Sequence, residues 1–320
     1  MPFRNFVAQT RAVSTEEHEA FFRQMLSDVD EPTAPYGLLK VHGDGTDISE
    51  HRLALDSSLS RRIRLQARAQ GVSAASIFHF VWGQVLSRLS DREDAVFGTV
   101  LLGRMHGAAA ADRALGLFIN TLPVRISLGE TTVADGIRQT HKTLAQLVSH
   151  EHASLALAQR CSGVPAQVPL FSALLNYRHH EVDTVAADES VAGMEVLSSQ
   201  ERTNYPCALS VDDLVTDFGL KMQVVRPLSA QRVCSYVQQT LSETVAALER
   251  SPRSPARMTG TRRAKPAETT RTSVRQAPLV ADMNRVRRAA AIALLAAFAL
   301  PSVAAASVTK REFIRNGDAL

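Results

Sequence analysis

A polar pair inside an apolar run is the first feature of this sequence that could carry chemistry. Residues 117–125 follow Gly116 and are largely apolar, but Asn120 and Thr121 break the run before it resumes at Leu122. A buried strand has no need of an amide and a hydroxyl at its centre, because such groups require hydrogen-bond partners there. We therefore expect these two side chains to face a cavity or channel.

Histidine is the side chain that most often transfers protons in enzymes. The chain has one tandem pair, His179-His180, which precedes acidic residues and is expected in a surface loop rather than at a catalytic site. His150 and His152 are expected at the end of a helix, where the dipole favours positive charge. We expect Arg125 to pair with an acidic side chain rather than with a substrate.

The cysteines do not indicate a metal centre or a disulfide framework. The three of them, Cys161, Cys207 and Cys234, are far apart in the sequence and form no CxxC pair. We expect buried thiols in a reducing cytoplasm and no bound metal. Residues 98–103 lack the Lys-Ser/Thr of a phosphate-binding loop and no GxGxxG occurs, so no nucleotide site is predicted.

The net charge of +4 is unevenly distributed along the 320 residues. Residues 251–320 hold 13 Lys/Arg and 4 Asp/Glu, whereas residues 1–250 hold 23 and 28, so the tail is basic (+9) and the body acidic (−5). An acidic body with four Tyr and one Trp is a poor candidate for a nucleic-acid groove. We therefore do not expect this protein to bind nucleic acid.

The elements that must position these residues follow from capping residues and apolar periodicity. Five helices are predicted, at residues 15–27, at 59–70, from Ser73 through Leu89, from Thr132 through Val148, and from Ser229 to about 249. Six strands are predicted, at residues 95–102, 118–126, 170–177, 194–199, 208–214 and 218–225.

The order of these elements predicts the fold class. Helices and strands alternate early, and the last two strands form a hairpin, with loops predicted at residues 31–45 and 105–112. This pattern favours an α/β fold in which helices pack on a mixed sheet, in one domain over residues 1–250.

The tail differs in composition from the body. Residues 251–282 are rich in Pro, Arg, Ser and Thr and are expected to be a disordered basic linker. Residues 283–320 begin with a basic stretch, then an apolar core and small residues, which is the composition of a signal peptide. Three explanations remain open: a reading-frame fusion, a weak membrane anchor through residues 289–306, or a soluble alanine-rich helix.

The run from Gly116 to Arg125 closely resembles the GxFxNTxxxR signature of condensation domains in nonribosomal peptide synthetases. Four other stretches resemble the same family in the same order, so that the resemblance covers residues 2 to about 249. These stretches are residues 2–9, 16–22 with 30–35, 150–153 with 170–179, and 201–206.

The resemblance implies a chloramphenicol acetyltransferase-like fold of two subdomains with a channel between them, of which this chain would supply the second. It implies that an acceptor amine attacks a donor carbonyl, both substrates being thioesters on carrier proteins. Phosphopantetheine would be carried by those partner proteins, with no cofactor bound directly. A cytoplasmic location is expected.

The resemblance also implies a channel wall and a missing motif. Three pairs of polar residues are the channel-lining candidates: Asn120 and Thr121, Asn176 and Tyr177, Asn204 and Tyr205. The alternative for each pair is a structural role in fixing strand ends and loops. The family motif HHxxxDG lies upstream of the segment that begins this chain, and the His179-His180 stretch departs from it in spacing and lacks its glycine.

We therefore expect a truncated condensation domain, lacking its first subdomain, with no catalytic residue of its own and inactive alone. A large exposed apolar patch and aggregation are expected on isolated expression. The alternatives are a non-catalytic module that docks carrier proteins, an epimerisation-type variant, and a free-standing acyltransferase that uses a coenzyme A thioester.

Overall fold

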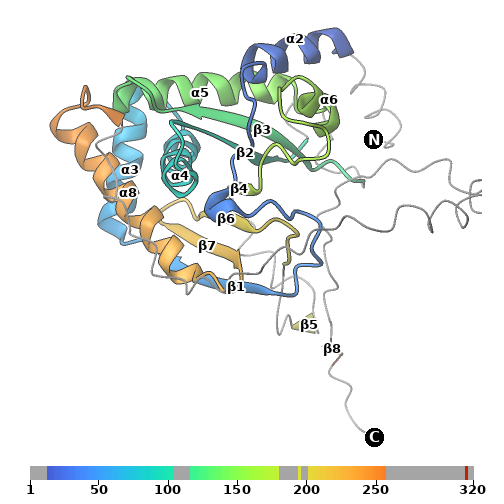
Figure 1. The fold of residues 1–320 in the computed structure, drawn as a ribbon. Helices are drawn as coiled ribbons and strands as arrows, with labels where there is room; N and C mark the ends of the chain where they lie inside the picture. The colour runs from blue at the N-terminus through green and yellow to red at the C-terminus, as the bar shows by residue number, and fades with distance from the viewer. Residues whose placement is uncertain (1–12, 104–115, 180–193, 196–200, 257–313, 316–320) are drawn as a thin grey trace, which may run out of the picture.

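The structure, a computed structural model, describes residues 13–103, 116–179, 194–195, 201–256 and 314–315 (Figure 1). Its main sheet has six strands in the order β1-β7-β6-β4-β2-β3. These strands are β1 (Ile48–Ala54), β2 (Asp94–Leu101), β3 (Asn120–Ser127), β4 (Ala173–His179), β6 (Cys207–Asp213) and β7 (Phe218–Val225). A separate two-stranded pairing joins β5 (Met194–Glu195) to β8 (Ile314–Arg315).

The sheet is mixed, as the sequence predicts. The three central strands β2, β4 and β6 run parallel, while β3, β7 and β1 are antiparallel to their neighbours. The carboxyl ends of the parallel strands therefore lie along one edge, which we call the carboxyl edge. The opposite edge is the amino edge.

The helices lie mainly on one face of the sheet. They are α2 (Thr15–Leu26), α3 (Ser57–Gln70), α4 (Ala74–Ser90), α5 (Val133–Ser149), α6 (Leu155–Arg160) and α8 (Ala230–Arg250), with a 3-10 turn η1 (Pro35–Gly37). Figure 1 shows the sheet curving around α4, with α3, α5 and α8 beside that helix. Helices α2 and α6 pack together near the edge strand β3.

Helix α4 is the centre of the hydrophobic core. Every residue from Ser76 to Ser87 is buried, which is the pattern of a helix enclosed on all sides. It is packed closely enough that a methyl group on Gly136 of α5 would come within 2.4 Å of the Phe80 ring. The core therefore fixes both α5 and the strands beneath α4.

Local sequence signals give most helix ends correctly. Ser14 and Glu17 form the predicted capping box of α2, and Ser73, Thr132 and Ser229 cap their helices through their side chains. Helix α3 ends at Gly71, which adopts a left-handed conformation with φ of 66°. These predictions are confirmed.

Strand β1 and helix α6 were not predicted, nor were the turn η1 and the two-residue strand β8. Strand β1 is an outer strand with alternating half-buried and exposed residues, and its sequence, ISEHRLA, has few of the apolar residues that mark a strand. Helix α6 is only six residues long, too short for an apolar period to be recognised. Strand β1 is positioned by its pairing with β7, and α6 by its Ser154 cap and by its contacts with α2 and β3.

Two predicted strands begin later than expected. Strand β4 starts at Ala173 rather than at residue 170. Strand β3 starts at Asn120, so the polar pair opens the strand and does not interrupt its centre. Leu117 and Ile119 precede the strand and are exposed, whereas Phe118 is buried. The expectation of a continuous strand from residue 118 was wrong because the pairing with β2 ends where Asn120 lies opposite Leu101, and there the Asn120 side chain binds backbone carbonyls of another loop.

The packed part of the chain extends past α8. Pro255 bridges to Thr132, and the backbone carbonyl of the fully buried Ala256 accepts a hydrogen bond of 2.8 Å from Gln84. Residues 251–256 are therefore ordered, although the linker was predicted to start at 251. Residues 257–313 and 316–320, with the rest of the predicted linker and the signal-like segment, lie outside the described residues, as do the predicted loop 105–112 and residues 196–199.

Candidate functional site

Strands β4 and β6 and helix α3 bring charged and phenolic groups together at the carboxyl edge. The Tyr177 hydroxyl donates to Asp213 Oδ2 at 2.6 Å, and Arg64 Nη2 donates to Asp213 Oδ1 at 2.6 Å. His179, the last residue of β4, places its Nδ1 atom 3.3 Å from Asp213 Oδ2. We call Arg64, Tyr177, His179 and Asp213 the carboxyl-edge network.

The carboxyl-edge network holds a buried carboxylate in its ionised form. Burial alone would raise the pKa of Asp213, but hydrogen bonds from Arg64 and Tyr177 outweigh it and leave the pKa below its usual value. Burial, followed by the hydrogen bond to Asp213, raises the pKa of Tyr177. Tyr177 therefore stays a neutral hydrogen-bond donor, and the network orients groups rather than transferring protons.

His179 is exposed, as predicted, but it is the last residue of β4 and does not lie in a loop. Its ring nitrogen lies within ion-pair distance of Asp213. The second histidine of the pair, His180, lies outside the described residues.

The signature residue Asn120 fastens the start of β3 to the turn between α5 and α6. Its Nδ2 atom donates to the carbonyl oxygens of Glu151 at 2.8 Å and Ala153 at 2.7 Å. Its Oδ1 atom accepts from the backbone N–H of Thr121 at 2.9 Å. All three contacts are to backbone, which is the structural role that the sequence left open.

Asn204 and Tyr205 lie at the amino edge, just before β6. Asn204 Nδ2 donates to the carbonyl of Val41 at 2.6 Å, and the buried Tyr205 ring stacks on Phe171 at a centroid distance of 5.8 Å. Burial raises the pKa of Tyr205. These contacts join the residue 201–206 segment to the loop before β1 and to the start of β4.

The three candidate pairs do not meet at one point. Asn120 and Asn176 lie toward the carboxyl edge, opposite Leu101 and Ser210 respectively. Asn204 and Tyr205 lie at the other edge. None of these contacts tests whether a pair faces a channel, so channel lining stays a prediction for all six residues.

A histidine pair that the sequence did not indicate joins α2 to α5. His150 caps the C-terminus of α5, as predicted, and its Nδ1 atom lies 2.9 Å from Nδ1 of His18. Burial, then the charge of the opposing histidine, lowers the pKa of His150, and burial lowers the pKa of His18. The expected stabilisation of a charged His150 by the helix dipole is therefore outweighed by burial.

His79 is the most deeply buried histidine in the described part of the chain. Its Nδ1 atom donates to the Ala75 carbonyl at 2.7 Å, so Nε2 is the unprotonated nitrogen and accepts from the Thr99 hydroxyl at 2.8 Å. Burial lowers its pKa to about 4. His79 lies within an apolar helix, where no sequence pattern distinguishes it. Its Nε2 atom attaches α4 to Thr99 of β2, while its Nδ1 atom is bonded within α4 itself.

Arg125, the last residue of the signature, pairs with acids as predicted. It contacts Asp94 on β2 at 2.7 Å and Asp28 after α2 at 2.5 Å. Burial would lower the pKa of Arg125, but the two carboxylates raise it overall. The signature arginine thus attaches the loop after α2 to strands β2 and β3.

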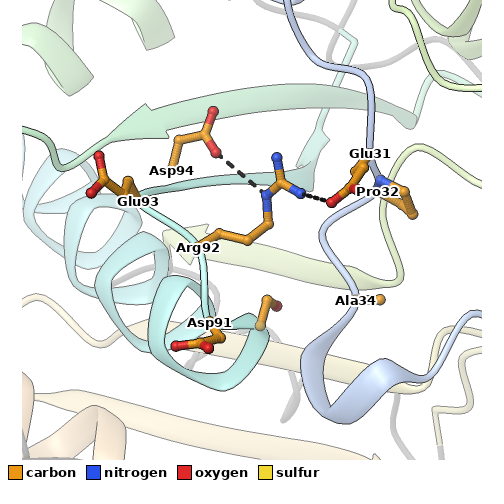
Figure 2. Close-up of a pocket in the computed structure, with 8 residues that line it drawn as sticks. Glu31, Pro32, Ala34, Asp91, Arg92, Glu93 and Asp94 are labelled. Carbon is orange, nitrogen blue, oxygen red and sulfur yellow. Dashed lines mark hydrogen bonds and ion pairs between the residues drawn. The ribbon is translucent and has the colours of Figure 1, made fainter.

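A surface cavity of about 470 Å³ lies at the amino edge, where α4 ends and β2 begins. Figure 2 shows Arg92 between Glu31 and Asp94, with Nη1 2.8 Å from Glu31 and Nε 3.6 Å from Asp94. The lining holds four acidic residues and the single base Arg92, and it lies at the opposite edge from Tyr177 and Asp213. Among the described residues, no group of His, Cys, Asp or Glu could hold a metal ion.

The comparison with known families decides the identity of this arrangement. The sequence model described as "Condensation domain" matches residues 2–265. The chain belongs to the condensation domain family. The malpibaldin synthetase of Mortierella alpina is 51% identical over 255 residues, which is 79% of this chain and 5% of that protein. The bacitracin synthase 3 of Bacillus licheniformis is 26% identical over 213 residues, covering 65% of this chain and 3% of that protein.

Solved condensation domains share the fold of this one. The condensation domain of the monacolin K polyketide synthase MokA gives a TM-score of 0.60 at 17% identity, covering 79% of this chain and 61% of that one. The first condensation domain of the CDA synthetase gives 0.58 at 15% identity, covering 81% and 56%. The predicted α/β class and chloramphenicol acetyltransferase-like fold are confirmed.

This condensation domain chain spans less than two thirds of each solved condensation domain and a small part of each synthetase. Amide-bond formation in general is the activity of the family. Within the described part of the chain, no helix is long and apolar enough to cross a membrane, and residues 289–306 fall outside that part.

Proposed function

We propose that residues 1–250 act as one subdomain of a condensation domain that joins carrier-bound acyl or peptidyl and aminoacyl thioesters. The observation that carries this proposal is the family match over residues 2–265. The partners would be carrier proteins, whose phosphopantetheine arms bring both substrates. The first subdomain would supply the other wall of the channel.

The reaction requires a group that removes a proton from the attacking amine. The acceptor amine attacks the donor thioester carbonyl, the C–S bond breaks, and the donor leaves its carrier thiol while the new amide forms. The attacking nitrogen must lose a proton, and a positioned base helps by about 10²–10⁴ in rate. The sequence holds no HHxxxDG motif to supply such a base.

Four of the described histidines already have structural contacts. His79 is buried with both nitrogens bonded, His18 and His150 face each other, and His179 contacts Asp213 at the carboxyl edge. We therefore propose that this chain does not form amide bonds alone. Its contribution is to orient tethered substrates, a service that can reach many kcal/mol in well-ordered sites.

Exposed apolar residues support contact with a further subdomain. Leu102, Leu117 and Ile119 lie near the carboxyl edge with exposed fractions of 57%, 77% and 53%. Neighbouring exposed apolar side chains mark interaction sites more often than free surface. Of the channel-lining candidates, Asn176 and Tyr177 lie toward the same edge, and we propose that this pair faces the shared channel.

A complementation assay tests the proposal. The purified full chain would be incubated with an aminoacyl carrier and an acyl carrier, alone or with the first subdomain of a condensation domain that bears HHxxxDG. We expect no amide product from the chain alone and condensation when both subdomains are present. Replacing the second motif histidine by alanine in the added subdomain should abolish the product and is the control.

Three results would contradict the proposal or part of it. Amide product from the chain alone would show that it contains its own catalytic groups. Tight binding of loaded carriers with no turnover in the presence of the first subdomain would favour the alternative, a docking module without catalysis. A soluble monomer that binds no hydrophobic dye would contradict the exposed apolar contact surface.

A further inference from the structure

Helix α3 has an arginine-rich outer face. Its 14 residues include four arginines and no aspartate or glutamate. Arg61, Leu65 and Arg68 follow one another at spacings of four and three, so they share one side of the helix. All three are exposed, and Leu65 is 54% exposed.

The arginines of this face differ in their pairing. Arg62 is bound to Glu249 at 2.7 Å and Arg64 to Asp213 at 2.6 Å, which attaches the helix to α8 and to the end of β6. Arg61 and Arg68 have no carboxylate partner among the residues that the structure describes. We call Arg61, Leu65 and Arg68 the α3 stripe.

Two arginines at the end of α8, which packs on α3, add positive charge beside the α3 stripe. Arg250 is the last residue of α8 and Arg253 follows it, whereas Arg138 of α5, which hydrogen-bonds to Gln70 at the end of α3, is paired with Asp135. Figure 1 shows α3, the end of α8 and the start of α5 together on one side of the molecule. This positive surface stands on a body whose net charge over residues 1–250 is −5.

We propose that the α3 stripe is a docking surface for an acidic amphipathic helix of a partner protein. Glutamates or aspartates on that helix pair with Arg61 and Arg68, and an apolar residue between them packs on Leu65. Complementary charge steers the approach, and the leucine provides the apolar contact that a purely ionic surface lacks.

The chemistry of the face favours protein over other polyanions. A single-stranded nucleic acid would call for exposed aromatic rings, and none lies on the α3 stripe. A membrane surface would call for a broad apolar face, whereas α3 exposes one leucine between two arginines. An acidic helix matches both the spacing and the single apolar position.

The test uses the full chain and a synthetic acidic probe. The probe is a helical peptide of about 20 residues with glutamates flanking a leucine stripe, a length at which isolated helices are stable enough to study. Binding is measured by fluorescence anisotropy of the labelled peptide, with a glutamine-for-glutamate peptide as the control. We expect binding of the acidic peptide that weakens with ionic strength, and none of the glutamine peptide.

Variants of α3 locate the binding site. Each variant keeps the basic tail, so the contribution of the tail is the same in every comparison. Arg61→Glu/Arg68→Glu should weaken binding at least about tenfold, and Leu65→Ala about fivefold. The control Lys40→Glu/Lys142→Glu makes the same change in net charge at two lysines on other elements and should change binding less than about twofold. Circular dichroism confirms that each variant is folded.

Three outcomes would overturn the proposal. The first is that wild-type protein does not bind the acidic peptide. The second is that the arginine and lysine variants weaken binding equally. The third is that duplex DNA or phosphatidylserine vesicles bind through Arg61 and Arg68 more tightly than the peptide does.

Discussion

The Nδ1 atoms of His18 and His150 lie 2.9 Å apart, although 132 positions separate the two residues in the sequence. Phe21 stacks on the His150 ring at a centroid distance of 4.2 Å, so the contact joins one face of α2 to the end of α5. One hydrogen can lie between two such nitrogens, and the pair is stable only while at least one Nδ1 is unprotonated. The attachment of α2 is therefore sensitive to protons.

Acid should weaken this attachment. The pKa values of His18 and His150 are both lowered from 6.5 in the folded chain, by burial first. The unfolded chain then binds more protons than the folded chain below pH 6.5. The contribution of this histidine pair to the free energy of unfolding is therefore fully present above that pH and is lost as the pH falls below it. Glu17 opposes the shift at both histidines, and His152 adds to it at His18.

The measurement is thermal unfolding of the full chain between pH 8 and about pH 5. The double variant His18→Gln/His150→Gln should show a shallower loss of melting temperature over this range. The other histidines, including His79, remain in both proteins and cancel in the comparison. Equal pH dependence of the two proteins would show that the pair does not couple to folding.

Replacing Asn120 should destabilise the chain rather than only alter a channel. Asn120→Ala leaves the Glu151 and Ala153 carbonyls without this donor, at a cost of about 1–3 kcal/mol in the free energy of unfolding. Urea denaturation measures this cost. Thr121→Ala, at the next position of β3, is the matched control and should cost less, because the Thr121 contact to Asn120 is made by its backbone.

Replacing Tyr177 should expose the electrostatic role of the carboxyl-edge network. Tyr177→Phe removes one hydrogen bond to the ionised Asp213 and should cost about 1.5–3 kcal/mol, because hydrogen bonds to charged groups exceed neutral ones. It should also raise the pKa of Asp213, shifting the acid limb of a pH–stability curve upward. Tyr236→Phe, whose hydroxyl accepts from an exposed arginine, is the control and should change stability little.

A methyl group at Gly136 should disrupt the packing of α5 on α4. A Cβ there would lie 2.4 Å from Phe80 Cε2, so Gly136→Ala should cost about 1–3 kcal/mol through forced repacking. Gly129→Ala adds the same methyl group where nothing lies within 4 Å and should stay within about 0.5 kcal/mol of wild type. If the two variants unfold at the same urea concentration, α4 and α5 are not packed in this way.

Much of the fold was predictable because its signals are local. The caps at Ser14, Ser73 and Thr132 each depend on residues three positions apart, and each helix starts where its cap predicts. The β6–β7 hairpin follows from alternation on both sides of a short turn. Strand β1 was missed because an outer strand can carry polar residues on both faces.

The candidate site was predictable only in its residue types. Asn120, Tyr177 and Arg125 were recognised from the sequence, but their partners were not. Asp213 and Arg64 are 149 positions apart, and nothing local to either predicts that they meet. Channel lining by the six candidate residues remains a prediction.

The sequence by itself determined the family, the α/β class and the ends of most helices, because ordered motifs, caps and periodicity lie within short stretches of chain. Only the tertiary structure decided that Asn120 opens β3 and fastens a distant turn, that His18 meets His150, and that Asp213 is held ionised beside Tyr177. These contacts depend on strand order and on burial, which arise from the packing of the whole sheet around α4.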